Sequence, residues 1–82
     1  MVWFKDVRAG TRKLDKLCRE DLAAARRLSE KDVRKLMGGR PKTSRTLADG
    51  TRQLVWNQGF SVVGIVFTKN HLFNRIYYRR GA

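Results

Sequence analysis

The fold is decided by residues 51–79, TRQLVWNQGFSVVGIVFTKNHLFNRIYYR. Runs rich in β-branched and aromatic residues occupy 51–57, 60–68 and 72–79, and only short polar connections separate them. Connections of this length can join antiparallel neighbours but leave no room for a crossover between parallel strands. The stretch therefore predicts a meander of three antiparallel strands.

The middle run, 60–68, is apolar at both alternating sets of positions, which is typical of a strand buried on both sides. We expect it to be the central strand. Trp56 lies within the preceding run and is predicted to face the core. The polar segment 42–47 is followed by the turn dipeptide Asp49-Gly50, and this pattern allows a fourth strand at the sheet edge.

Helices are predicted upstream of the strands. Apolar residues recur at three- and four-residue steps from Leu14 to Leu28, which indicates a helix over about 12–28 with Thr11 as its cap. Asp21 falls inside the apolar stripe of this helix. Its carboxylate either lies at the edge of the stripe, where it reaches water or an Arg, or marks a break between two shorter helices.

A second helix, predicted over 30–37, has clear signals at both ends. The segment that begins at Ser29 has the spacing of a capping box, and Gly38-Gly39 followed by Pro41 is typical of a helix C-terminus. The glycine pair lacks both the preceding strand and the Gly-Lys-Ser/Thr ending of a phosphate-binding loop. It therefore predicts a helix cap.

These elements predict an α+β fold, a two-layer sandwich in which two helices pack on a three-stranded or four-stranded antiparallel meander. Residues 1–82 are expected to form a single domain, because a chain of this length supports one small core and excludes multi-domain enzymes. Within it we expect a flexible N-terminal segment at 1–10, a helical part at 11–38 and a β part at 42–80.

The charge of the chain is strongly positive and uneven. There are 19 Lys and Arg against 7 Asp and Glu, a formal net charge of +12, and Asp49 is the only acidic residue from 33 to 82. An excess of this size attracts polyanions, so we expect nucleic acid, an anionic membrane surface or an acidic protein as the partner. The alternative is that the basic residues only solvate the surface.

The last β run supplies the candidate binding surface. Its alternation places Phe73, Arg75, Tyr77 and Arg79 on one side, which we expect to face away from the helices. Aromatic rings stack on bases and Arg neutralises phosphates in sheet-based single-strand binders. Cross-strand pairs and solvated Arg give the same pattern for stability alone. The predicted nucleic-acid-binding residues are Arg40, Lys42, Arg45, Arg52, Phe73, Arg75, Tyr77, Arg79 and Arg80.

Groups for catalysis or metal binding are not clustered in the sequence. His71, the single histidine, is predicted in a hairpin turn, and Cys18, the single cysteine, is predicted to be a small core residue. Neither has the sequence neighbours that acid–base chemistry, an activated nucleophile or a zinc site requires. We therefore expect a non-enzymatic binding module without a cofactor or metal.

Signals for export and membrane insertion are weak. The apolar stretch 62–67 is far shorter than the ~20 residues of a membrane-spanning helix, and no secretory leader is visible before Lys5 and Asp6. We expect a cytoplasmic protein without a transmembrane segment, or an envelope protein if a leader has been removed. Trp3 and Phe4 are expected to cover part of the sheet or to form a protein or homodimer contact.

A series of short motifs extends from residue 28 to 78. It comprises the helix 28–38, then Pro41, Asp49-Gly50, Val55-Trp56, Ile65-Val66-Phe67 and Phe73-Asn74-Arg75-Ile76. In this order the motifs resemble the SmpA/OmlA family, the BamE-type outer-membrane assembly proteins. The resemblance implies two helices packed on a three-stranded antiparallel sheet. It also implies the alternative function, a non-catalytic adaptor for protein–protein interaction.

Overall fold

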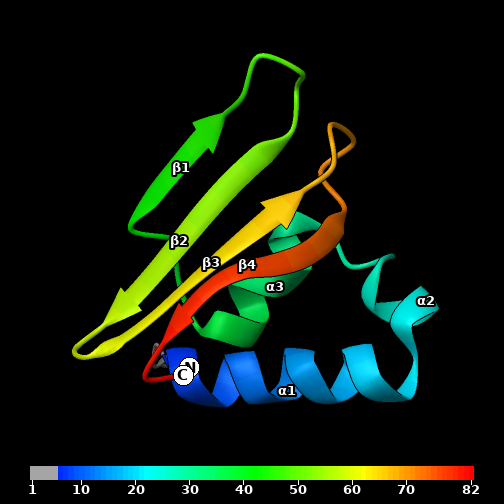
Figure 1. Ribbon diagram of the computed structural model, residues 1–82. Coiled ribbons are helices and arrows are strands. Elements are labelled where there is room, and N and C mark those ends of the chain that lie inside the picture. Colours follow the sequence, from blue (N-terminus) through cyan, green and yellow to red (C-terminus); the bar gives the residue numbers. More distant parts are fainter. Residues whose placement is uncertain (1–5) are drawn as a thin grey trace.

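The protein has an α+β fold with two layers, one of helices and one of strands (Figure 1). The computed structural model describes residues 6–82, whose four strands form a single antiparallel sheet with strand order β1-β2-β3-β4. The elements in this range are α1 (Val7–Glu20), α2 (Leu22–Ala25), α3 (Glu30–Met37), β1 (Thr43–Thr46), β2 (Arg52–Gln58), β3 (Ser61–Phe67) and β4 (Phe73–Arg80). The predicted fold class is confirmed, and the fourth strand that the sequence allowed is present at the edge.

Helix α1 begins earlier than predicted. Asp6 is its cap and accepts a hydrogen bond from the Ala9 amide at 3.0 Å, whereas Thr11 is buried inside the helix and donates to the Val7 carbonyl at 2.7 Å. The assignment of Thr11 as the cap is therefore wrong. Residues 7–10, which were predicted to precede the helical part, belong to α1. A glycine inside a helix is costly by propensity alone. Here Gly10 is favoured by a close approach of α1 to α3.

Asp21 marks a break, so the single helix predicted over 12–28 is wrong. The Asp21 amide donates to the Leu17 carbonyl at 2.7 Å and ends α1. The Asp21 side chain accepts from the Ala24 amide at 3.0 Å and starts α2. Short polar side chains are favoured at the start of a helix because they accept hydrogen bonds from backbone amides that have no acceptor within the helix. Of the two alternatives for Asp21, the break is the one that the structure contains.

Helix α3 has the predicted ends. Ser29 and Asp32 form a reciprocal capping box, in which each side chain accepts from the backbone amide of the other at 3.1 and 2.9 Å. Gly38 adopts a left-handed conformation with φ 77°, and the amides of Gly38 and Gly39 donate to carbonyls in the last turn. This is the Schellman arrangement, which favours a residue without a Cβ at the left-handed position.

The core lies between the helices and one face of the sheet. Trp56 is fully buried, as predicted, and its indole Nε1 donates to the Gly39 carbonyl at 3.0 Å. Cys18 packs against this core and is partly buried. The buried apolar side chains are Val7, Leu14, Ala25, Val33, Met37, Leu54, Trp56, Val63, Ile65, Phe67 and Phe73.

Strand β4 does not alternate simply, and the predicted outer row is wrong in two positions. Ile65 lies opposite Ile76 and Phe67 opposite Phe73, but between these pairs the register shifts. Each shift places an extra residue on β4 and reverses the faces of the residues beyond it. As a result Phe73 is 2% exposed in the core, and Arg79 lies on the helix side.

The helices within residues 6–82 are all too short or too polar to cross a membrane. Trp3 and Phe4, the predicted protein-contact residues, lie outside the described residues.

We predict that Gly10→Ala destabilises the protein by about 1–3 kcal/mol, the usual cost of overpacking. A Cβ at this position would lie 2.6 Å from the Leu36 carbonyl oxygen and 2.9 Å from Met37 Sδ, and the backbone atom cannot move away. Helix propensity alone predicts the opposite sign, a gain of about 1 kcal/mol. Urea unfolding followed by circular dichroism measures the difference. Arg8→Ala, on the exposed side of the same helix, is the control, and a stabilised Gly10→Ala variant would contradict the close approach.

Candidate nucleic-acid interface

The face of the sheet that points away from the helices is the candidate site. Residues directly opposite each other on paired strands share a face, and neighbours in one strand alternate. Because Leu54 and Trp56 point into the core, Gln53, Val55 and Asn57 point outward. Register pairs and contacts extend this outer face across all four strands. Its members are Thr43, Arg45, Gln53, Val55, Asn57, Val62, Gly64, Val66, Arg75, Tyr77, Tyr78 and Arg80.

The middle of the outer face holds the aromatic groups. Tyr78 lies opposite Gly64. The ring of Tyr77 also lies over Gly64, because a Cβ built on that glycine would be 2.7 Å from Tyr77 Cζ. Tyr77 is 37% exposed and Tyr78 is 48% exposed. Because Gly64 has no side chain, the Tyr77 ring can pack directly on the backbone of the central strand β3, and part of the residue stays accessible.

Cations flank this aromatic centre. One cross-strand row runs from Arg75 through Val66 and Gln53 to Arg45, which places an Arg at each end of the sheet's width. With neighbouring strands ~4.8 Å apart, the two ends of the row are separated by about 14 Å. Arg80 lies opposite Val62 nearer the β2–β3 turn. β1–β4 contain five Arg and no acidic residue.

The five strand arginines fall into two groups according to the face on which they lie. Arg52, on the helix side, donates from Nε to Glu30 Oε2 at 2.6 Å. Arg79, also on the helix side, makes two hydrogen bonds to the Asp15 carboxylate at 2.5 and 2.7 Å. The three arginines of the outer face pair with no carboxylate among residues 6–82. The fold thus neutralises the cations beneath the helices and leaves those of the open face uncompensated.

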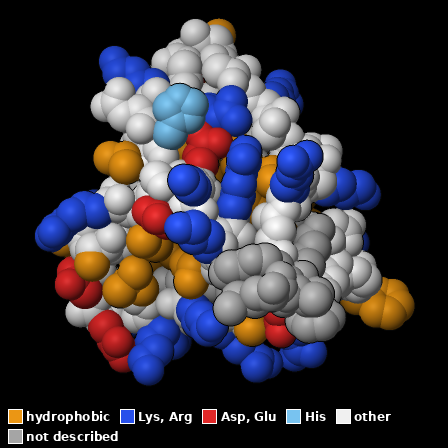
Figure 2. Space-filling view, turned by 180° about the vertical axis from the view of Figure 1, so that it is seen from behind, with side chains coloured by type: hydrophobic (Ala, Val, Ile, Leu, Met, Phe, Trp, Pro, Cys, Tyr) orange, Lys and Arg blue, Asp and Glu red, His pale blue; other side chains and the backbone are white. Residues whose placement is uncertain are grey.

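Glu30 is the centre of a cluster that the sequence reading missed. Besides Arg52, its Oε2 contacts His71 Nδ1 at 2.6 Å, and its amide donates to the His71 carbonyl at 3.0 Å. Burial alone would raise the pKa of Glu30, but the hydrogen bonds and charges of Arg52 and His71 outweigh it and the net pKa is lowered. Figure 2, a view of the helix side, shows the pale blue His against a red acidic side chain.

No local motif could have revealed this cluster, because its members lie 22 and 41 residues apart along the chain. His71 is in a turn, as predicted, and has a positive φ of 65°. The arrangement ties the start of α3 to β2 and to the β3–β4 turn. We assign it a structural role.

Four predicted site residues lie together on the outer face, namely Arg45, Arg75, Tyr77 and Arg80. Three others do not join them, because Phe73 is in the core and Arg52 and Arg79 are paired on the helix side. Arg40 and Lys42 are exposed in the connection from α3 to β1.

The sequence reading also missed Phe60, which is 94% exposed at the tip of the β2–β3 hairpin. The available signal of a turn at this point was Gly59 in a short polar connection. In the structure Gly59 has a positive φ of 59°. Phe60 was instead assigned to the start of a strand. Its ring stands at the same end of the sheet as Arg80, since Val62 and Arg80 are register partners.

Other reactive groups are not assembled into a site. Residues 6–82 hold no group of three or more potential metal ligands. Burial, followed by the charge of Asp15, raises the pKa of the Cys18 thiol, although Arg26 and Arg79 partly oppose this. A raised pKa disfavours the reactive thiolate.

Comparison with known proteins finds no match, either to a family model, to a curated protein or to a solved structure. The resemblance to the SmpA/OmlA family therefore stays a prediction.

We predict that Glu30→Gln lowers the free energy of unfolding by ~2 kcal/mol at pH 7, since it removes charge-assisted hydrogen bonds from a buried carboxylate. The pKa of Glu30 is lower in the folded chain than its ordinary value of 4.5. The stabilisation is therefore complete above pH 4.5 and is lost as the pH falls through the lower folded-state value.

Urea unfolding at pH 7 and pH 3 tests this prediction, with Glu20→Gln on the exposed side of α1 as the control. We expect the difference between Glu30→Gln and the parent to shrink at pH 3. A difference of equal size at both pH values would show that the Glu30 carboxylate contributes nothing through its charge.

Proposed function

We propose that this protein is a non-catalytic module that binds nucleic acid through the outer face of its sheet. The observation that carries the proposal is the sorting of the strand arginines, in which Arg45, Arg75 and Arg80 face outward without a carboxylate partner among residues 6–82. Phosphates of a polyanion would neutralise these cations and release bound counterions. The net charge of +12 would steer the polyanion toward the protein over a longer range.

The outer face suits single strands better than duplexes. Tyr77 and Tyr78 are partly exposed in the middle of an open sheet, with arginines on both sides. Unpaired bases can stack on such rings while Arg contacts the flanking phosphates. In a duplex the bases are already stacked on one another, and the rings would contribute little.

Solvation alone explains the outer face less well. Carboxylates were available to pair with Arg52 and Arg79 on the helix side, yet no acidic residue occurs in any of the four strands. Unneutralised like charges on one face oppose folding. A binding function would explain why the protein tolerates this repulsion, whereas solubility does not require unneutralised arginines gathered on one face.

The second candidate is the protein–protein adaptor of the SmpA/OmlA kind. Its supporting observation is the free edge of β1, whose four residues are all exposed and could pair with a strand of another protein. A second copy of this chain is a poor partner for the outer face, because two such faces would oppose arginine to arginine. An acidic protein fits better. Sedimentation with and without an oligonucleotide separates the adaptor and nucleic-acid candidates.

We predict that the double variant Arg75→Gln, Arg80→Gln binds a single-stranded oligonucleotide roughly tenfold more weakly at near-physiological salt. Two lost phosphate contacts should also reduce the slope of log affinity against log salt by about 1.4. Fluorescence anisotropy at several salt concentrations gives both quantities. Arg12→Gln with Arg19→Gln, two exposed residues of α1, removes the same charge from the other layer. An equal loss in this control would reduce the effect to nonspecific attraction.

We predict that Tyr77→Leu weakens single-strand binding and leaves the salt slope unchanged, because it removes a stacking surface and no charge. Loss of one base–aromatic stack costs about 1–3 kcal/mol. Leucine keeps an apolar cover over Gly64, so the sheet is expected to remain folded. Anisotropy with single-stranded and double-stranded oligonucleotides measures the effect. Undiminished single-strand affinity would remove Tyr77 from the site.

A further inference from the structure

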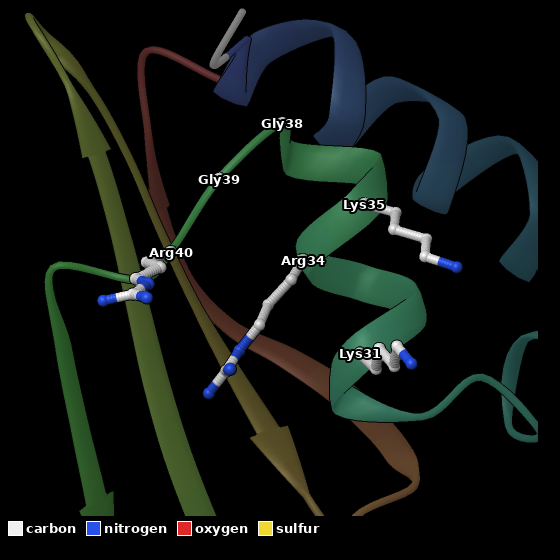
Figure 3. Close-up of a pocket in the computed structure, with 6 residues that line it drawn as sticks. All are labelled: Lys31, Arg34, Lys35, Gly38, Gly39 and Arg40. Atoms are coloured by element: carbon white, nitrogen blue, oxygen red, sulfur yellow. The ribbon is translucent and has the colours of Figure 1, made fainter. Parts of the chain in front are cut away.

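A second group of unpaired cations lies on the helix side, between α3 and the β1–β2 hairpin (Figure 3). Arg34 and Arg40 line a hollow of about 320 Å³ that reaches Ser44 of β1. Both also line a larger hollow of about 500 Å³, which is formed by α3 and the glycines that follow it. Figure 3 shows both side chains extending from α3 and its following loop on the side of the strands, whereas Lys35 projects from the other side of the helix. Neither Arg34 nor Arg40 pairs with a carboxylate among the described residues.

We name this region the basic groove and define it by the residues that line the smaller hollow, Arg34, Arg40, Pro41 and Ser44. It combines two guanidinium groups with the hydroxyl of Ser44. Guanidinium groups bind phosphate oxygens through charge-assisted and bidentate hydrogen bonds, and a hydroxyl adds a neutral donor. These groups match the chemistry of a phosphodiester.

The backbone beside the groove is already satisfied. The carbonyls of Arg34 and Lys35 accept from the amides of Gly39 and Gly38, and the Gly39 carbonyl accepts from the Trp56 indole. A helix C-terminus normally repels an anion because its carbonyls are free. Here these hydrogen bonds reduce that repulsion and hold the loop that carries Arg40 against the core.

The basic groove and the outer face meet at β1. Ser44 lines the groove, whereas Arg45, the next residue, lies on the outer face opposite Gln53. β1 is an edge strand, and all four of its residues are exposed. The β-strand β1 is therefore the only element between the two surfaces, and neighbouring β-strands in a sheet are ~4.8 Å apart.

We propose that the basic groove binds phosphates of the same single-stranded nucleic acid whose bases lie on the outer face, so that the strand turns around the edge formed by β1. This inference rests on the proposed function and extends it to a second contact region. A duplex has a persistence length of about 150 bp and cannot follow so tight a turn. Arg45 lies on the path at the edge, between the aromatic centre and the groove.

The test compares short and long oligothymidine strands, of about 4 and about 16 nucleotides, which span the usual site sizes of single-strand binding domains. The double variant Arg34→Gln, Arg40→Gln should bind the long strand roughly tenfold more weakly. Its salt slope should be shallower by about 1.4, and its affinity for the short strand should equal that of the parent. Arg12→Gln with Arg19→Gln is the control of equal charge.

A second measurement locates the contact without mutation. In amide chemical-shift mapping of the parent protein, the long strand should move the signals of Gly39 and Ser44, and the short strand should leave them in place. Arg34 and Arg40 are both exposed, so the groove variant should also unfold at the parent's temperature.

The outcomes separate the inference from the function on which it rests. If the parent binds neither strand at low salt, the proposed function fails and the groove inference with it. Suppose that the Arg75, Arg80 variant binds both oligonucleotides more weakly than the parent, whereas the Arg34, Arg40 variant binds both as tightly as the parent. The proposed function then stands and the groove inference is overturned. The proposed turn around β1 is overturned if the Arg34, Arg40 variant loses as much affinity for the short oligonucleotide as for the long one. It is also overturned if the parent binds a duplex as tightly as the long single strand.

Discussion

The sheet has two faces, but the described chain supplies helices for only one of them, and most other features depend on this constraint. All of the large buried side chains point to the helix side, where α1 and α3 close the core. Within this layer, Gly10 lets α1 approach the backbone of α3 closely. Among residues 6–82, only the sheet itself stabilises the outer face. It uses β-branched residues and places the Tyr77 ring on Gly64, where a side chain would otherwise stand.

The same one-sided arrangement sorts the charges. Helices α1 and α3 carry Asp15 and Glu30, which are within reach of arginines on the near face of the sheet. Within residues 6–82 the far face has no second layer from which a carboxylate could come, and its own strands contain none. Arginine on that face therefore remains available to an external anion. The basic groove follows the same rule, since it lies at the margin of the helix layer, where Arg34 and Arg40 find no carboxylate among the described residues.

Features that depend on local signals could be predicted from the sequence. The short connections fixed the antiparallel meander, and the Ser29 capping box and the Gly38 cap fixed α3, because each of these acts over a few residues. The N-terminus of α1 was misplaced because Gly10 counts against a helix locally, whereas its benefit comes from a contact with α3 that is distant in sequence.

The candidate site could be predicted only in part, because some of its features depend on contacts between segments that are distant in sequence. Arg75 and Tyr77 were assigned to the outer face correctly, but simple alternation placed Phe73 and Arg79 there as well. The two register shifts on β4 depend on how it pairs with β3, and the sequence of β4 alone does not contain that information. The Glu30 cluster was invisible because its three side chains come from separate parts of the chain.

The edge strand β1 connects these observations. A free edge invites pairing with another protein, and proteins limit this with short strands and charged side chains. β1 has only four residues, all polar or charged, and Arg45 places a positive charge on it. Such an edge resists pairing with a second copy of this basic chain. The same shortness and charge suit an edge that a flexible polyanion crosses, because a longer strand would lengthen the path between the outer face and the basic groove. The features that protect this edge are therefore also those that would let it serve as part of the binding surface.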